Sequence, residues 1–200
     1  MMTAPIQVPA PVRASVAGDA DRATAVLTLA FSTDPVCRWV WHDPQRYLAS
    51  FPSFVSAFGG AAFGQGTAFS TPDYGGTALW LPPGITPDGE ALGDLLQSTV
   101  AEVDQADVFA FLEQMDHFHP SEPHWYLPLI GVDPTIQGRG HGSALLRQAL
   151  ARCDRDGTPA YLESSSPRNI PLYQRHGFEL LGTIQAGESP PMFPMLRTPR

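Results

Sequence analysis

The sequence predicts a single soluble α/β domain, and three observations lead to this expectation. The chain has 200 residues, which is a usual length for one domain. Apolar residues make up 43% of it and charged residues 16%, so the chain can bury a large core and is too hydrophobic to be disordered. Strand-like and helix-like segments alternate along residues 1–200 without an internal repeat or an interdomain linker.

The first 120 residues are expected to hold most of the helices. Residues 1–10 are rich in proline and are expected to be frayed. Helices are predicted from capping residues and apolar spacing at residues 19–31, 45–58, 88–100 and 102–118. The pair Asp34-Pro35 is expected to stop the first of them. Strands are predicted at residues 12–17, 61–70 and 77–81, the last two forming a hairpin.

The last 80 residues are expected to supply most of the sheet. Strands are predicted at residues 124–132, 160–164, 178–185 and 192–197. Pro128 falls inside the first of these strands, which predicts a bulge or an unpaired position there. Helices are predicted at residues 138–156 and 170–176, and glycines follow both.

Several classes of protein are excluded by composition. No apolar run reaches the length of a membrane span, and the first residues lack the features of a signal peptide, so a cytoplasmic protein without a membrane partner is expected. The two cysteines, Cys37 and Cys153, exclude a disulfide scaffold and a four-thiolate zinc site. With a net charge of −8, the chain is a poor candidate for binding nucleic acid.

The charges are distributed unevenly along the chain, which has no lysine. Residues 1–137 carry four arginines and fifteen acidic residues, whereas residues 138–200 carry eight arginines and five acidic residues. One interpretation is that the last third holds an anion and that the acidic middle attracts a cation such as a protonated amine. The alternative is an acidic, solvated pair of helices beside a mildly basic helix.

The most informative segment is a glycine-rich loop between a predicted strand and a predicted helix. Glycines alternate in Gly138-Arg139-Gly140-His141-Gly142, where they leave backbone N–H groups uncovered at a helix N-terminus. This arrangement favours a cradle for phosphate or pyrophosphate. A P-loop is excluded because the chain has no lysine. A dinucleotide site, with Glu163 on the ribose, remains a weak alternative because the glycine spacing differs from G-x-G-x-x-G.

Two motifs resemble those of the GNAT acyl-CoA N-acyltransferases. Gln137-Gly138-Arg139-Gly140-His141-Gly142 fits the family pattern [QR]-x-x-G-x-[GA], and Gly131-Val132-Asp133-Pro134 before it is also typical of the family. Downstream, residues 169–178 resemble the pattern N-x-x-x-Y-x-x-x-G-F. The resemblance is closest to puromycin N-acetyltransferase-like members, covers residues 121–181, and implies a mixed, mostly antiparallel sheet flanked by helices.

The resemblance implies that residues 121–186 form the half of the domain that binds acetyl-CoA. Its pyrophosphate would lie on the backbone of the residues Gln137, Gly138, Arg139, Gly140, His141, Gly142 and Ser143. The pantetheine arm would pair with the strand at Ile130, Gly131 and Val132 and would touch Asn169, which also caps a short helix. Two neighbouring strands would splay apart and leave backbone donors for the thioester carbonyl, as in an oxyanion hole.

The resemblance also assigns acid–base roles. Tyr173, one helical turn after Asn169, would donate a proton to the departing thiolate. The family often has a glutamate where this chain has Tyr126, so His124 and Glu163 are both candidates for the base that takes the amine's proton.

Other reactive side chains in the sequence suggest no further site. His117 and His119 with Asp116 lack a third ligand at metal spacing, so no metal is expected. Cys153 falls on the apolar stripe of its helix and is predicted to be core.

The predicted function is transfer of an acetyl group from acetyl-CoA to a primary amine of a small molecule, by direct attack in a ternary complex. Trp39, Trp41 and Tyr47 are expected to line an apolar acceptor pocket, whereas the aromatic residues with helical spacing, Phe51, Phe54 and Phe58, are expected to be mostly core. The acceptor is therefore expected to be a cationic amine that carries an apolar or aromatic group. The alternatives are a non-catalytic acyl-CoA-binding module and a dinucleotide-dependent oxidoreductase, and no oligomeric state is predicted.

Overall fold

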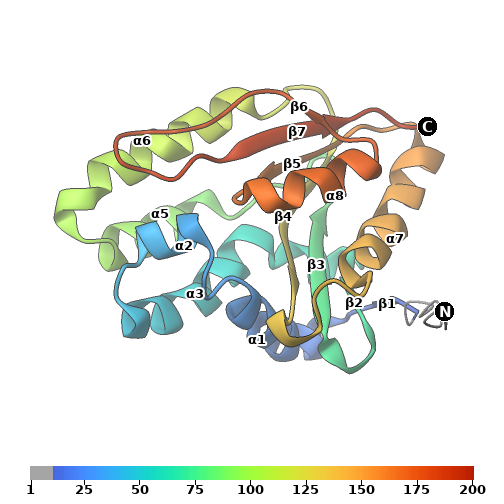
Figure 1. The fold of residues 1–200 in the computed structure, drawn as a ribbon, viewed down its shortest axis with the longest axis horizontal. Helices are drawn as coiled ribbons and strands as arrows, with labels where there is room; N and C mark the ends of the chain where they lie inside the picture. Colours follow the sequence, from blue (N-terminus) through green and yellow to red (C-terminus); the bar gives the residue numbers. More distant parts are fainter. Residues whose placement is uncertain (1–10) are drawn as a thin grey trace, which may run out of the picture.

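The computed structural model describes residues 11–200, and a seven-stranded sheet runs through them (Figure 1). The strand order is β1-β2-β3-β4-β5-β7-β6, and every neighbouring pair is antiparallel except β4 and β5. The strands are β1 (Arg13–Ala14), β2 (Ala68–Ser70), β3 (Gly76–Leu81), β4 (Trp125–Val132), β5 (Ala160–Ser164), β6 (Glu179–Leu180) and β7 (Phe193–Arg197). The predicted mixed, mostly antiparallel sheet is confirmed, and the expectation for residues 1–10 lies outside the described residues.

Helices cover both faces of this sheet. The α-helices are α1 (Ala20–Ala30), α2 (Pro35–Val40), α3 (Pro44–Gly59), α4 (Ala61–Gly64), α5 (Gly89–Thr99), α6 (Glu102–Phe118), α7 (His141–Asp156) and α8 (Ile170–Arg175). The 3-10 turns are η1 (Ala17–Asp19), η2 (Pro72–Tyr74), η3 (Pro134–Ile136) and η4 (Pro167–Asn169). Asp43, which was predicted to cap its helix, and Asp88, which was predicted as the first residue of its helix, are both N-caps. Their carboxylates accept hydrogen bonds from the backbone N–H of Arg46 and Ala91 at 2.8 and 3.0 Å.

Successive residues of the central strands belong to two separate cores. Tyr161 on β5 packs with residues of α1, α2, α3, α5 and α6, whereas its neighbours Ala160 and Leu162 pack with α7 and α8. Side chains alternate between the faces of a strand, so these two groups of helices lie on opposite faces of the sheet. The functional side chains can therefore be assigned to one face or the other.

Three sequence predictions were wrong in detail. Asp34-Pro35 was expected to stop the first helix, but α1 already ends at Ala30, and the pair starts α2 because the Asp34 carboxylate accepts hydrogen bonds from the N–H groups of Val36 and Cys37 at 3.0 and 3.1 Å. Residues 61–64 form α4 instead of a strand, since Gly60 keeps helical angles and Ala62 is fully buried. The strands predicted at residues 12–17 and 178–185 shorten to β1 and β6, which lie at the edges of the sheet.

The predicted irregularity at Pro128 is confirmed as a bulge in β4. Leu129 pairs with Leu79 on β3, but Tyr126 pairs with Leu81, so β4 has one residue more than β3 between these pairs. The extra residue places Tyr126 and Leu129, three positions apart, in the same core. The bulge lies just where β4 leaves β5, and it re-aims the side chains beyond it.

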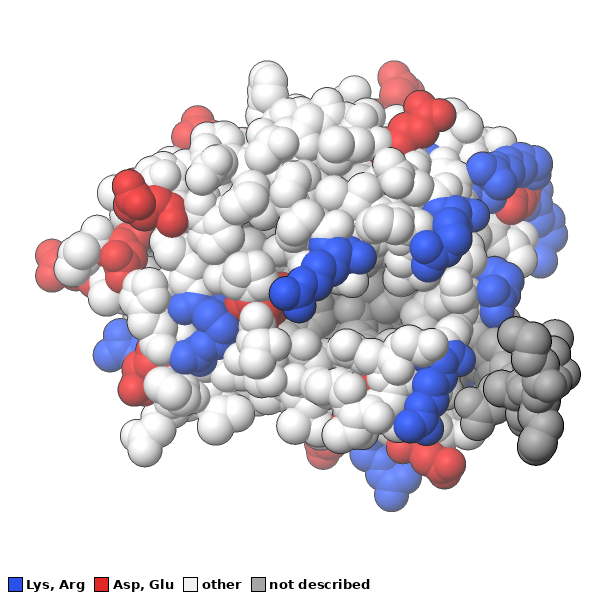
Figure 2. Space-filling model, in the orientation of Figure 1, with Lys and Arg blue, Asp and Glu red and all other residues white. Residues whose placement is uncertain are grey.

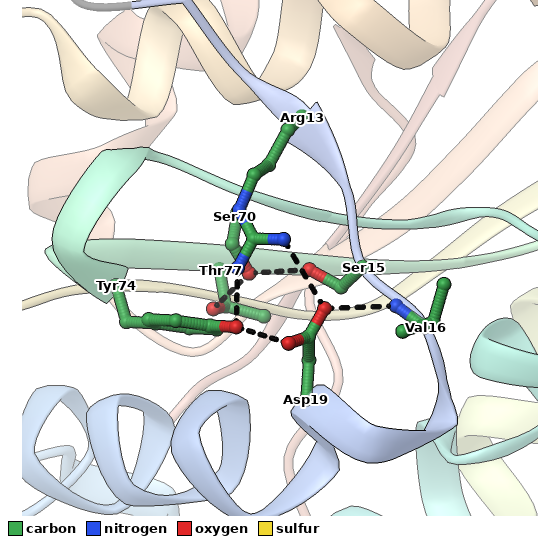
Figure 3. Close-up of polar contacts among 7 residues, drawn as sticks. All are labelled: Arg13, Ser15, Val16, Asp19, Ser70, Tyr74 and Thr77. Carbon is green, nitrogen blue, oxygen red and sulfur yellow. Dashed lines mark hydrogen bonds and ion pairs between the residues drawn. The ribbon is translucent and has the colours of Figure 1, made fainter.

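Polar contacts attach the short edge strand β1 to the rest of the sheet (Figure 3). The Ser15 hydroxyl donates to the Ser70 hydroxyl at 2.8 Å, and the latter lies 3.0 Å from the Thr77 hydroxyl. Beside this buried row, the Asp19 carboxylate accepts from the Tyr74 hydroxyl and pairs with the Arg13 guanidinium at 3.3 Å. These contacts hold a strand of two residues in register without an extensive backbone ladder.

Both cysteines are free and buried. Cys153 is fully buried on the apolar face of α7, as predicted, and burial raises its pKa to about 12, so it stays a thiol at neutral pH. Among residues 11–200, no helix combines the length and the apolar character that a membrane crossing requires.

Replacing Asp154 with asparagine is expected to lower the free energy of unfolding at pH 7 by roughly 3 kcal/mol. Arg197 on β7 is 4% exposed and is held by Asp154 of α7, with nitrogen–oxygen distances of 2.8 and 2.9 Å, and asparagine would leave its buried charge unpaired. The hydrogen bond from Arg197 contributes most to lowering the pKa of Asp154 below its ordinary value. The pair therefore contributes fully above the ordinary pKa of an aspartate, and its contribution is lost as the pH falls through the lowered value.

Urea unfolding at pH 7 and at pH 3 measures this effect, and Asp156→Asn is the matched control. Asp156 pairs at 3.7 Å with Arg155, whose side chain is 69% exposed, so its loss is expected to cost less than about 0.5 kcal/mol. Equal losses in the two variants would show that the Arg197 pair does not hold β7 against α7.

Candidate active site

The glycine loop turns the chain from β4 into α7. Asp133 starts this turn by accepting a hydrogen bond from the N–H of Thr135 at 2.8 Å. Gly138 and Gly140 then adopt left-handed angles, with φ of 75° and 86°, which favour glycine. Gly140 is the N-cap of α7 and has no side chain, so the first N–H groups of the helix receive no side-chain cap. A Cβ at Gly138 would meet no atom within 4 Å, so the loop is open.

A cavity of about 510 Å³ opens beside this loop. It is lined by Gln137, Gly138, Gly140, His141, Gly142 and Ser143 from the loop and the start of α7, and by residues 127–132 of β4. Of the predicted pyrophosphate ligands, Arg139 alone does not line the cavity, and its side chain is exposed. The Ser143 hydroxyl lies 2.8 Å from Nε2 of His176, so this residue offers its backbone to a ligand. Figure 2 shows a hollow in this face of the molecule, bordered by basic side chains, with most acidic side chains in view at the outer edges.

Strands β4 and β5 separate beside the cavity. Their parallel pairing covers three residue pairs and ends at Leu127 and Leu162. Beyond that point, β5 pairs with β7, and β4 pairs with β3. The edge of β4 at Ile130, Gly131 and Val132 that faces away from β3 therefore has no strand partner, and it lines the cavity. Open backbone donors and acceptors next to the uncapped N-terminus of α7 suit an extended amide-bearing ligand.

A buried carboxylate enters the cavity where the two strands part. Glu163 lies on β5, its side chain is 3% exposed, and its Oε2 accepts a hydrogen bond from the Tyr126 hydroxyl at 2.8 Å. Its other oxygen, Oε1, is buried without a hydrogen-bond partner among the described residues. Tyr126 occupies the position where the resemblance leads one to expect a glutamate, and it holds the glutamate of the neighbouring strand. The unpartnered oxygen is free to accept a hydrogen bond from a ligand.

Two histidines connect this carboxylate with the surface. Nδ1 of His119, which follows α6, lies 3.8 Å from Oε1 of Glu163, and its Nε2 lies 3.0 Å from Nε2 of His124. His124 in turn lies 2.8 Å from the carbonyl oxygen of Glu122. Burial lowers the pKa of His124, and the neighbouring His119 lowers it further, so His124 is neutral at pH 7. The two candidate bases, Glu163 and His124, are thus the ends of one chain of side chains.

Tyr173 reaches the cavity from the other face of the sheet. It is 5% exposed in the core formed with α7, whereas Glu163 shares a face with Tyr161 and the other core. Burial raises the pKa of the Tyr173 phenol, and the nearby carboxylate of Asp34 adds to this effect, so the phenol keeps its proton at neutral pH. A retained proton is what a general acid requires.

Asn169 lines the cavity, but its predicted capping role was wrong. Its side chain makes no cap hydrogen bond, because Asn169 ends the turn η4 with helical angles and so does not start α8 from an extended conformation. Its amide is therefore not committed to the helix.

The far end of the cavity is an apolar chamber between four helices. It is formed by Val36, Cys37 and Val40 of α2, the adjoining Trp41, Phe54 and Phe58 of α3, Leu96 of α5, and Val108, Phe111, Leu112 and Met115 of α6. Of the three aromatic residues predicted to line such a pocket, only Trp41 does so. Tyr47 is core and donates a hydrogen bond to the carbonyl of Thr28 at 2.8 Å, and Trp39 packs on Phe111 instead.

Sequence reasoning missed several of these residues. Phe54 and Phe58 were expected to be core because their spacing is helical, but spacing does not distinguish a core from a cavity wall. His119 was considered only with His117 and Asp116, as part of a metal site. In the structure the ring of His117 packs on Phe118, while His119 turns to Glu163. Among residues 11–200 no group of three metal-ligating side chains comes together.

A mostly antiparallel sheet that opens between two parallel strands, beside a glycine loop at a helix N-terminus, defines the GNAT class of acyltransferases. Residues 92–178 match the acetyltransferase (GNAT) family. The chain is 27% identical over 206 residues to an uncharacterized N-acetyltransferase of Schizosaccharomyces pombe, covering 92% of this chain and 81% of that protein. This family match covers the glycine loop and the motif of residues 169–178, and it confirms the resemblance that the motifs predicted.

Two solved structures agree with this assignment. The structure described as histone acetyltransferase HPA2 and related acetyltransferase from Corynebacterium glutamicum is 26% identical, with a TM-score of 0.68 over 96% of this chain and 98% of that one. Arylalkylamine N-acetyltransferase 2 from Aedes aegypti is 12% identical, with a TM-score of 0.65 over 94% of this chain and 98% of that one. The second likeness shows the fold alone.

Proposed function

We propose that the protein transfers an acetyl group from acetyl-CoA to a primary amine of a small molecule, by direct attack in a ternary complex. The observation that carries this proposal is a single cavity in which the glycine loop, the open edge of β4, Glu163 and Tyr173 meet. The name of the Aedes aegypti neighbour, an arylalkylamine N-acetyltransferase, supports a small-molecule acceptor. The closer resemblance to puromycin N-acetyltransferase-like members stays a prediction.

The residues of the loop suit a diphosphate. Gln137 to Ser143 would hold the pyrophosphate of acetyl-CoA through backbone N–H groups at the start of α7, where the helix dipole is positive. The open edge of β4 at Ile130, Gly131 and Val132 would bind the amides of the pantetheine arm, and Asn169 would contact the same arm. Backbone N–H groups at the splay would stabilise the negative charge that develops on the thioester oxygen.

Glu163 and Tyr173 would move the two protons of the reaction. As the amine nitrogen forms its bond to the carbonyl carbon, Glu163 would take the amine's proton and pass it through His119 to His124 at the surface. As the carbon–sulfur bond breaks, Tyr173 would give its proton to the departing thiolate, and the phenolate would then take a proton from water that enters as the products leave. The products are an N-acetyl amide and the free thiol of CoA. Since the base and the acid lie on opposite faces of the sheet, each faces one of the two reactants.

A thiol-release assay tests this proposal. Purified protein with acetyl-CoA is expected to release thiol over time only when a primary amine is added. A rise in melting temperature with CoA but no thiol release with any amine would favour the non-catalytic acyl-CoA-binding module. A rise in melting temperature with NAD(H) but not with CoA would favour the oxidoreductase. The sheet argues against that alternative, because β4 and β5 are the single parallel pair among the described strands, whereas dinucleotide-binding domains have a mostly parallel sheet.

Replacing Tyr173 with phenylalanine is expected to lower kcat about 10- to 100-fold, with little change in the affinity for CoA. The effect is below the upper range for general acids because a thiolate leaves readily even without a proton. Steady-state kinetics and CoA titration measure the two quantities. Unchanged turnover would remove Tyr173 from the mechanism.

A further inference from the structure

The apolar chamber carries an inference about the acceptor that rests on the proposed function and goes beyond it. Every residue that α2, α3, α5 and α6 contribute to the cavity is apolar, except for the thiol of Cys37. Burial raises the pKa of that thiol well above its ordinary value, so it is uncharged. The walls are stiffened by aromatic contacts, with Phe54 stacked on Phe58 at 5.0 Å and Trp41 edge-on to Phe54 at 5.7 Å.

The chamber leads directly to Glu163. Phe58 packs edge-on against Tyr126 with ring centroids 6.0 Å apart, and the Tyr126 hydroxyl donates a hydrogen bond to Glu163. Both Phe58 and Tyr126 belong to the core on the face of the sheet where Glu163 lies. An amine bound at the unpartnered Oε1 of Glu163 would therefore extend its substituent into the chamber.

The charged side chains of the cavity other than Glu163 either lie away from the apolar chamber or are hydrogen-bonded within the protein. Among residues 11–200, the carboxyl and guanidinium side chains that line the cavity are those of Asp34, Glu163 and Arg175. The Asp34 carboxylate accepts hydrogen bonds from two backbone N–H groups and from the Ser165 hydroxyl, so both of its oxygens are occupied. Arg175, at the end of α8, lies on the face of α7. Glu163 is therefore the carboxylate of the cavity that keeps an oxygen without a hydrogen-bond partner among the described residues.

The acidic residues of the middle of the chain do not supply a second carboxylate. None of the nine between Asp88 and Glu122 lines the cavity. Most of them are exposed, and they form an acidic, solvated surface on α5 and α6. The sequence left open whether these charges attract a cation or face solvent, and the structure places them away from the chamber.

We propose that the acceptor is a monoamine with an apolar body, whose amino group meets Glu163 and whose alkyl or aryl group fills the apolar chamber. A second ammonium group on the acceptor would be buried among apolar side chains without a partner, which costs much more than an alkyl group in the same place. Diamines and polyamines are therefore expected to be poor acceptors. Position 112 is suited to a test of this selectivity, because Leu112 lines the chamber and is only half-buried, so that a charged side chain there can stay in contact with water.

Hexylamine and 1,6-diaminohexane test the inference, because they have the same chain length and differ by the second amino group. The wild-type protein is expected to acetylate hexylamine with a kcat/KM about 100-fold higher than for the diamine. Leu112→Glu would place a hydrated carboxylate in the chamber and is expected to raise kcat/KM for the diamine about 10-fold. Leu112→Gln, which has nearly the same shape without the charge, is expected to give no such gain.

The outcomes separate the inference from the function on which it rests. Thiol release with the diamine at a kcat/KM equal to or above that for hexylamine would overturn the inference and leave the proposed acetyl transfer intact. No thiol release with any primary amine would overturn both. If Leu112→Glu does not fold, the comparison of hexylamine with 1,6-diaminohexane in the wild-type protein still tests the inference. Equal gains in kcat/KM for the diamine in Leu112→Glu and Leu112→Gln would show that charge at position 112 does not set the selectivity.

Discussion

Replacing Glu163 with glutamine is expected to lower kcat by about 10²- to 10⁴-fold, the range for loss of a general base. Glutamine keeps the shape of the side chain and can still accept the hydrogen bond from Tyr126, so the fold and the cavity are expected to persist. It cannot take a proton from the amine. Steady-state kinetics with a primary amine measure the effect, and CoA titration is expected to give an unchanged affinity.

The histidine chain supplies the matched comparison for this variant. His119→Gln and His124→Gln are expected to lower kcat by less than Glu163→Gln, since water can replace a relay that leads to the surface. If His124→Gln abolished turnover while Glu163→Gln left it intact, the base would be His124. If neither variant changed kcat, proton removal would not be the task of this cluster.

Replacing Gly142 with glutamate is expected to weaken CoA binding by at least about 100-fold. Gly142 is the second residue of α7 and lines the cavity, and its Cβ would meet only the Leu172 side chain, at 3.4 Å. A carboxylate there would repel the diphosphate, and like charges brought together cost several kcal/mol. The same carboxylate interacts favourably with the helix dipole, so the free protein is expected to be as stable as the wild type or slightly more so.

Thermal unfolding with and without CoA measures both parts of this prediction. The wild type is expected to gain about 2.7 kcal/mol of stability at a CoA concentration of 100 times its Kd, and Gly142→Glu is expected to gain at most about 0.4 kcal/mol at the same concentration. Gly142→Ala is the control, because it adds the Cβ without the charge and is expected to keep most of the affinity. A glutamate variant that binds CoA normally would show that the diphosphate is not held at this loop.

Local patterns in the sequence were sufficient for most of the helices and strands and for the glycine loop. The bounds of α6 and β5 were predicted to the residue, because the apolar spacing of α6 ends at prolines and β5 is a short run between turn residues. The alternating glycines predicted a helix N-terminus without a side-chain cap, and α7 begins in this way at Gly140. Aspartates 43 and 88 marked their helices because a carboxylate satisfies N–H groups only two or three residues away.

The tertiary structure alone decided which side chains share a cavity. Glu163 and His119 are 44 residues apart in the sequence and meet because β5 lies beside the end of α6. Phe54 and Phe58 show the same helical spacing whether they pack in a core or line a cavity. The exposure of the acidic residues on α5 and α6 depends on which face of each helix packs against its neighbours. The sequence by itself predicted the resemblance to the GNAT family, most of the helices and strands, and the glycine loop at a helix N-terminus, because these depend on residues close together in the chain. The tertiary structure decided that Glu163, His119 and His124 form one cluster and that the chamber is apolar, because packing brings together residues whose spacing in the sequence carries no signal.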